Sequence, residues 1–153
     1  MTNATIVSRK DLTEHVTEFI VRPDVPVTYV AGQWVSLALP TGPNPPLKRA
    51  YSMATTPRED GNLVLTFDHV PEGLGSGYLA TLKKNDRLQM SDCMGRFILP
   101  DEIDDGIPIC FAAHFTGIVP VRGLIESLKG RDCENPLRVL YSSPPGEESV
   151  YQE

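Results

Sequence analysis

The sequence lacks several features that would direct it to particular classes of protein. No apolar run approaches the ~20 residues that a membrane span requires. Its 14 Lys and Arg are outnumbered by 20 Asp and Glu, and the resulting charge of −6 disfavours binding to nucleic-acid phosphates. The first residues show no basic segment followed by an apolar one, so no secretory signal is predicted and the protein is interpreted as cytoplasmic.

Metal-binding patterns are also missing. The three cysteines, Cys93, Cys110 and Cys133, form no CxxC pair and have no fourth partner for a zinc or iron–sulfur set. The three histidines are isolated from one another in the sequence as well. We therefore predict free thiols in a reducing compartment and no metal site.

Turn-forming residues, by contrast, are plentiful, because the chain holds 12 Gly and 14 Pro, and this disfavours an all-helical bundle. Between the turns, apolar and polar residues alternate as they do in half-buried strands. Six strands are predicted, at residues 5–9, 16–22, 35–39, 49–54, 63–67 and 87–92, with a short helix at 76–84 that Ser76 caps. This pattern predicts an antiparallel barrel or sandwich over residues 1–100.

A different pattern follows the acidic linker at 100–106. Residues 107–113 are continuously apolar, which is typical of a strand buried on both faces of a parallel sheet. Apolar residues then recur with helical spacing over 118–128, and residues 137–141 have the pattern of a second strand. Residues 107–153 thus predict one βαβ unit that is too small for most independent domains. The unit packs on the barrel, pairs with another chain, or is truncated, and we favour truncation.

The segment Arg49-Ala50-Tyr51-Ser52 carries the most informative chemistry. On a strand, Arg49 and Tyr51 share one face. A guanidinium grips a phosphate with two hydrogen bonds, and a phenol ring lies flat on a planar heterocycle. The alternative is an ordinary strand with one exposed arginine and one packed tyrosine.

A glycine-rich turn at residues 73–79 leads into the predicted short helix. Its backbone N–H groups and the positive end of the helix can hold a phosphate. The alternative is that the glycines only cap the helix. Taken singly, neither motif decides the function.

In combination, these motifs resemble the ferredoxin-NADP reductase family. Arg49-Ala50-Tyr51-Ser52 is similar to its RxYS flavin motif, and the preceding Gly32-Gln33-Trp34-Val35 is similar to its PGQ-type strand. Later matches follow in the family's order: Gly75-Ser76 at the pyrophosphate-binding turn, Asn85-Asp86 where a Gly-Asp usually stands, Gly95-Arg96-Phe97 at the end of the barrel, and residues 116–120 at the GTGI-x-P turn that opens the nicotinamide-nucleotide domain.

The resemblance implies a fold and a set of site residues. The implied fold is a six-stranded antiparallel flavin-binding barrel, residues 1–100, followed by the first βαβ unit of a Rossmann-like NAD(P)-binding domain, residues 107–153. It places Ser52 near the flavin N5, as the catalytic position. The implied cofactor-binding residues are Arg49 for the flavin phosphate, Tyr51 stacked on the isoalloxazine, Ser76 at the pyrophosphate, and Ala50, Ser52, Asp68, His69, Val70, Gly75, Thr116 and Gly117.

The implied function is that of a flavin-dependent oxidoreductase. Electrons pass from NAD(P)H through bound FAD, with FMN as the alternative flavin, to ferredoxin or another iron–sulfur or redox acceptor. A second hypothesis is a non-catalytic flavin-binding or electron-transfer module that needs a partner chain to complete its sheet. A third is a relic that folds poorly.

One departure from the family bears on the nicotinamide site. Where the family has Gly-Gly before Thr-Gly, this chain has His114-Phe115. Glycines let the backbone approach dinucleotide phosphates closely, and the Phe115 ring is expected to fill that space. His114 either contacts a phosphate or nicotinamide or covers the open end of the sheet, and we favour the second interpretation.

Overall fold

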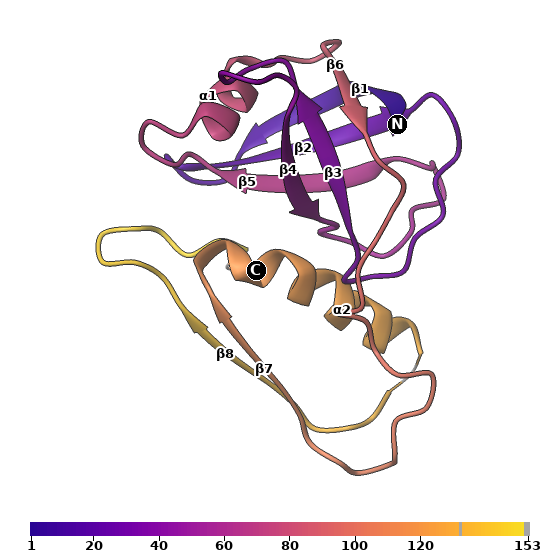
Figure 1. Cartoon of the computed structure of the whole chain (residues 1–153). Coiled ribbons are helices and arrows are strands. Elements are labelled where there is room, and N and C mark those ends of the chain that lie inside the picture. The colour runs from indigo at the N-terminus through magenta and orange to yellow at the C-terminus, as the bar shows by residue number, and fades with distance from the viewer. Residues whose placement is uncertain (132, 152–153) are drawn as a thin grey trace.

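The computed structural model describes residues 1–131 and 133–151. The first hundred residues are organised around one six-stranded antiparallel sheet (Figure 1). In chain order its strands are β1 (Thr2–Asp11), β2 (Val16–Pro23), β3 (Trp34–Leu39), β4 (Leu47–Ser52), β5 (Leu63–Asp68) and β6 (Arg87–Met90). The order across the sheet is β4-β3-β6-β1-β2-β5.

The sheet curls until its two end strands meet. Directly after β4, Met53 forms an isolated antiparallel bridge with Leu65 of β5, and the N–H of Ala54 donates to the carbonyl of Val64 at 2.9 Å. These contacts join β4 to β5 and nearly close a barrel, which removes most of the exposed sheet edge. The predicted six-stranded antiparallel barrel is confirmed.

Alternation along the strands fills the barrel. Val35, Leu37 and Leu39 of β3 are 0–2% exposed and point into a core that also takes up Leu63 and Leu65 of β5. Strand β5 departs from simple alternation, because its outward residues are buried as well. The second part of the chain covers that outer face.

Helix α1 (Leu74–Thr81) closes one end of the barrel and begins two residues earlier than predicted. The predicted cap is wrong: Gly73 is the N-cap residue, and Ser76 lies inside the first turn. The Ser76 hydroxyl instead accepts the N–H of Val70 at 3.1 Å. The side chain therefore fastens the loop before the helix and does not cap the helix itself.

The second part of the chain is the predicted βαβ unit. Strand β7 (Ile109–His114) is followed by the 3₁₀ turn η1 (Phe115–Gly117), helix α2 (Ile118–Gly130) and strand β8 (Leu137–Ser142). The two strands pair in parallel, with Ile109 opposite Leu137 and His114 opposite Ser142. Helix α2 lies between this pair and the barrel (Figure 1).

The expectation that residues 107–113 are buried on both faces is wrong. Ile107 lies before the strand and is 51% exposed, and the residues of β7 alternate between half-buried and exposed. The physical reason is that the described residues cover only the face of β7 toward α2, so the apolar run has no layer on its other side.

Helix α2 packs closely on the barrel. A Cβ added to Gly123 would lie 3.2 Å from the backbone carbonyl atoms of Thr55, so the helix backbone approaches the barrel backbone directly. Val16 of the barrel, Ile118 and Val121 of the helix, and Val150 near the end of the chain form one buried cluster. None of the helices in the described part of the chain is long and apolar enough to cross a membrane.

Candidate functional site

Strand β4 turns Arg49 and Tyr51 toward one face, as predicted from their spacing. They lie opposite Leu37 and Val35 of β3, whose side chains are buried in the core. Residues directly opposite in an antiparallel pair project to the same side. Arg49 and Tyr51 therefore project to the inner face of β4, and Arg49 does so beside α1.

The Arg49 side chain lies against the first turn of α1. A Cβ added to Gly75 would come within 3.2 Å of the Arg49 Cγ and 3.4 Å of a Leu39 methyl group. Glycine at this position is what lets the arginine and the helix start lie together. The first-turn N–H groups have no partner within the helix, and the base of the Arg49 side chain lies beside them, while its guanidinium donates to the Lys48 carbonyl at 2.9 Å. N–H groups of a helix start together with an arginine are suited to a phosphate.

Tyr51 is half-buried beside an aromatic group. Its ring meets the Phe67 ring edge-on, with centroids 6.2 Å apart, and Phe67 is stacked on His69 at 5.6 Å. Burial raises the pKa of Tyr51 to about 12, so the phenol stays protonated at neutral pH. The ring offers a neutral apolar surface with a hydroxyl at its edge.

The other two residues of the motif are less enclosed. Ala50 is exposed and pairs with Ser36, while Ser52 is half-buried at the end of β4 and pairs with Trp34. Ser52 therefore stands where the strand leaves the sheet, three positions after Arg49 and on the opposite face of β4.

Asp68, His69 and Val70 form the end of β5 and the start of the loop to α1. His69 takes part in a chain of hydrogen bonds that the sequence did not indicate. Its Nε2 lies 3.0 Å from the Thr17 hydroxyl, which donates to Asp11 at 2.7 Å. Because the Thr17 proton goes to Asp11, His69 donates from Nε2. The Thr17 hydrogen bond is the main reason that the pKa of Asp11 is lowered.

Thr116 and Gly117 lie in η1, on the other unit, at the carboxyl ends of the parallel strands. This is the edge at which open α/β sheets bind ligands. The turn contacts β5, so it faces the barrel. The structure thus brings Arg49 beside Gly75 at the start of α1, leaves Tyr51 further along β4 beside Phe67, and holds Thr116 and Gly117 on a separate element.

The structure shows the conformation of His114 and Phe115, which stand where the family has two glycines. Phe115 adopts φ = +46°, a left-handed conformation that glycine adopts without cost, and its ring packs on the buried cluster around Ile118. His114 is exposed, and its Nδ1 lies 2.9 Å from the Ser142 hydroxyl across the strand pair. That position agrees with the interpretation that His114 covers the open end of the sheet.

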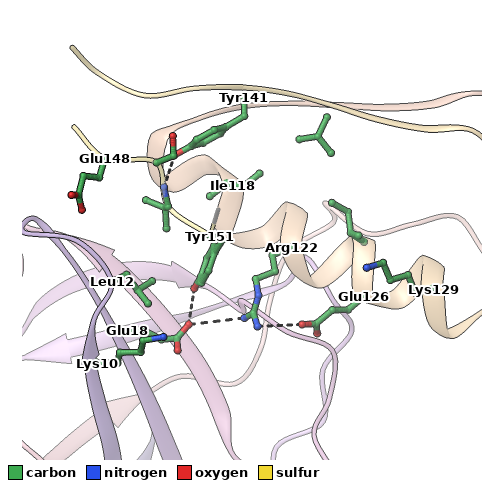
Figure 2. Close-up of a pocket in the computed structure, with 14 residues that line it drawn as sticks. Lys10, Leu12, Glu18, Ile118, Arg122, Glu126, Lys129, Tyr141, Glu148 and Tyr151 are labelled. Carbon is green, nitrogen blue, oxygen red and sulfur yellow. Dashed lines mark hydrogen bonds and ion pairs between the residues drawn. The ribbon is translucent and has the colours of Figure 1, made fainter. Parts of the chain in front are cut away.

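Sequence analysis missed a cleft of about 870 Å³ that lies between the barrel and α2. Figure 2 shows Glu18, Arg122 and Tyr151 at its wall, joined by hydrogen bonds and ion pairs. Tyr151 is 133 positions from Glu18 in the sequence, so no local pattern signals this contact. Within residues 1–131 and 133–151, no three His, Cys, Asp or Glu side chains converge as metal ligands.

The amino-acid sequence of the chain is similar to those of several reductases. The chain is 32% identical to ferredoxin–NADP reductase B of Sorangium cellulosum over 82% of its length, and 30% identical to the reductase subunit of an aromatic O-demethylase from Amycolatopsis over 97%. It is 29% identical over 81% of its length to CDP-6-deoxy-L-threo-D-glycero-4-hexulose-3-dehydrase reductase of Yersinia pestis. The chain spans 50%, 44% and 36% of these proteins, respectively.

Solved structures share the fold. The Amycolatopsis cytochrome P450 reductase GcoB superposes with a TM-score of 0.85 at 25% identity, over 99% of this chain and 45% of that one. A flavohemoglobin from Malassezia yamatoensis, solved with FAD and heme, gives 0.87 at 21% identity, over 98% of this chain and 40% of that one.

The sequence of residues 3–98, the barrel with its RxYS strand and its glycine-rich turn, matches the family described as the oxidoreductase FAD-binding domain. The resemblance to ferredoxin-NADP reductases that the motifs indicated is confirmed. The chain belongs to the oxidoreductase FAD-binding domain family.

Proposed function

We propose that this chain is the flavin-binding part of a reductase, which takes electrons from NAD(P)H and passes them to an iron–sulfur or other redox acceptor. Residues 1–100 act as the flavin domain, and residues 107–153 supply the start of the nicotinamide-nucleotide domain. The observation that carries the proposal is the contact of the Arg49 side chain with α1 across Gly75, which places a cationic residue beside the N–H groups of a helix start, a combination that suits a phosphate.

Each site residue has a task in this proposal. Arg49 and the N–H groups of Gly75 and Ser76 bind the flavin phosphates, and Tyr51 lies against the isoalloxazine as a neutral ring. Ser52 hydrogen-bonds near N5, and the segment of Asp68, His69 and Val70 holds the flavin through its backbone. When bound, FAD supplies the exchange of a hydride for single electrons.

The η1 turn receives the nicotinamide cofactor. Thr116 and Gly117 directly precede α2 at the carboxyl edge of the β7–β8 pair, and a helix start in this place is suited to a phosphate. The Phe115 ring is turned into the interface cluster, so it leaves more of this edge open than the sequence led us to expect.

The first test is spectroscopic. The purified chain is mixed with FAD, and its visible spectrum is recorded before and after anaerobic addition of NADH or NADPH. Retained flavin that bleaches with either donor supports the reductase, whereas a chain that retains no flavin contradicts the proposal. A parallel titration with FMN measures how much the adenylate group of FAD, which includes the second phosphate, adds to affinity.

A specific observation favours a second candidate, a flavin-binding module that is completed by a partner chain. Among the described residues, β8 pairs with β7 alone, and Leu137, Val139 and Leu140 on it are 39–64% exposed. An apolar strand of this kind is a surface for strand addition. Flavin that is retained but stays oxidised with both donors, and bleaches once a partner reductase chain is added, supports this candidate over the first.

The proposed compartment is the cytoplasm. The thiols of Cys93, Cys110 and Cys133 are free. Free thiols are usual where glutathione and thioredoxin keep cysteines reduced.

A further inference from the structure

The segment that follows β8 returns to the barrel and contacts it through Tyr151. Val150, 2% exposed, enters the cluster formed by Val16 of the barrel and Ile118 of α2. The Val150 N–H donates to the Tyr141 hydroxyl at 3.1 Å. Two consecutive residues, Val150 and Tyr151, therefore fix the segment to β8 and to the barrel.

The Tyr151 hydroxyl is held by two neighbouring barrel residues. It donates to a carboxylate oxygen of Glu18 at 2.7 Å and lies 2.6 Å from the Thr66 hydroxyl. Glu18 and Thr66 are directly opposite each other on β2 and β5. Because the phenol proton goes to Glu18, Thr66 donates to the Tyr151 oxygen. Burial raises the pKa of Tyr151, which keeps the phenol protonated and able to donate.

Arg122 of α2 joins the same group. Its guanidinium lies 4.7 Å from the centre of the Tyr151 ring and 4.0 Å from the Glu18 carboxylate (Figure 2). It also donates to the Ala54 carbonyl at 3.2 Å and pairs with Glu126 at 3.5 Å. One arginine thus contacts the barrel, the returning segment and its own helix.

This group fixes the position of α2, and the start of α2 carries the η1 turn. Arg122 stands four residues after Ile118, one turn from the helix start. We propose that Tyr151, Glu18, Thr66 and Arg122 form a clamp that sets the placement of η1 against the barrel. They are positioning residues: they hold the nicotinamide-binding turn at the distance and angle from the flavin site that hydride transfer needs. The effect on hydride transfer rests on the proposed function, whereas the effect on the position of η1 and α2 does not.

The mechanical test is hydrogen exchange of the full chain. Tyr151→Phe removes the hydroxyl and keeps the ring beside the Arg122 guanidinium. Glu18→Gln removes the negative charge that faces both Tyr151 and Arg122. In each variant, amides of η1 and the first turns of α2 are expected to exchange about tenfold faster, while those of β3 and β6 are unchanged. Thr66→Ser, which keeps a hydroxyl, is expected to exchange like the parent chain.

Ser91→Ala is the control, because the Ser91 hydroxyl accepts the Ser36 N–H at 2.9 Å and donates to the Asp92 carbonyl at 2.7 Å, and neither partner belongs to α2 or to the clamp. A uniform rise of exchange in the Tyr151 variant, like that of the control, would mean general destabilisation and would overturn the clamp. Unchanged exchange at α2 would overturn it as well.

Flavin reduction separates this inference from the function on which it rests. In Tyr151→Phe, the rate of bleaching at saturating NAD(P)H is expected to fall about tenfold while the Kd for FAD stays the same. If the bleaching rate of Tyr151→Phe is unchanged while its α2 amides exchange faster, the clamp holds α2 in place but has no effect on flavin reduction. If the parent chain is not bleached by either donor, the reductase proposal fails, and the exchange result still decides whether the clamp exists.

Discussion

The backbone conformation of Phe115 destabilises the fold, whereas the packing of its side chain stabilises it. Its φ of +46° lies in the left-handed region, which costs a residue with a Cβ about 1–2 kcal/mol. Its ring offsets that cost by packing on the interface cluster of Val16, Ile118 and Val121. The sequence showed that this position departs from the family's glycine, but the local pattern contains nothing about where the ring goes.

Two substitutions separate these contributions. Phe115→Ala and Phe115→Gly both remove the ring, and only glycine relieves the left-handed backbone. We expect the glycine variant to be more stable than the alanine variant by about 1 kcal/mol, measured by urea unfolding. Equal stabilities, or a more stable alanine variant, would be incompatible with the left-handed conformation.

Arg49 is expected to carry much of the flavin phosphate binding. Arg49→Ala should weaken FAD affinity by about 10–100-fold, the cost of losing a charge-assisted hydrogen bond. The measurement is quenching of flavin fluorescence. Lys48→Ala is the control, since Lys48 is the neighbouring cation on the other face of β4 and its loss should change affinity by less than about twofold. A comparable loss in both variants would indicate a general electrostatic effect.

The thiols should differ in reactivity. Burial, with a smaller effect of Asp92, raises the pKa of Cys93 to about 11, whereas Cys110 is exposed on β7. Only the thiolate reacts, so at pH 8 about one Cys93 in a thousand is reactive. Iodoacetamide followed by peptide mass spectrometry should find Cys110 modified first, and Cys93 labelling should rise about tenfold per pH unit from 7 to 10. Rapid labelling of Cys93 at pH 8 would contradict its burial.

At the scale of elements, helix α1 contains two glycines with different surroundings. A Cβ on Gly75 would press on Arg49 and Leu39, while a Cβ on Gly77 would meet nothing within 4 Å. Both positions are helical, so alanine gains the same intrinsic propensity at each. The pair therefore isolates the contact between α1 and β4 from the stability of the helix.

Gly77→Ala is expected to raise stability by about 0.5–1 kcal/mol and leave FAD affinity unchanged. Gly75→Ala is expected to weaken FAD binding severalfold, because it moves the Arg49 side chain away from the helix start. Thermal unfolding and flavin titration of both variants test this together. FAD affinity that is equal in the two variants would exclude the contact across Gly75 as part of the site.

The elements also show what sequence reasoning could reach. Two-residue alternation predicted all six strands, because one face of each fills the barrel. The RxYS and glycine-turn motifs were each recognised in the sequence, but their contact across Gly75 was not predicted, because it joins β4 to α1 only in the folded chain. The start of α1 was missed because serine is a residue type that often caps helices. Here the Ser76 hydroxyl instead accepts the N–H of Val70 in the preceding loop. The Thr17–His69 contact and the Tyr151 clamp join residues 52 and 133 positions apart, and only tertiary packing brings such residues together.

At the scale of the whole molecule, the barrel and the βαβ unit meet backbone to backbone. Gly123 of α2 leaves no room for a side chain against Thr55, whereas Gly130 at the end of the same helix has open space around it. Gly123→Val should therefore force the helix away from the barrel at a cost of about 1–3 kcal/mol.

Gly130→Val, the control, should change stability by less than about 0.5 kcal/mol. Urea unfolding measures the cost, and the NADPH-driven bleaching rate should fall in Gly123→Val because the η1 turn moves with the helix. If Gly123→Val is as stable and as active as its control, the close approach of α2 to Thr55 is not maintained in solution.

The placement of β6 between β3 and β1 has a consequence for the nascent chain. Strand β1 pairs with β2 along one edge and with β6 along the other. In the second pair, Thr5 lies opposite Arg87, which is 82 positions later in the sequence. At about 5–20 residues per second, a ribosome needs about 4–16 s to make that stretch. During this interval β1 can fold back only on β2, and one of its edges stays open to other strands. A chaperone that protects the emerging chain therefore has this edge to shield until Met90 has been made.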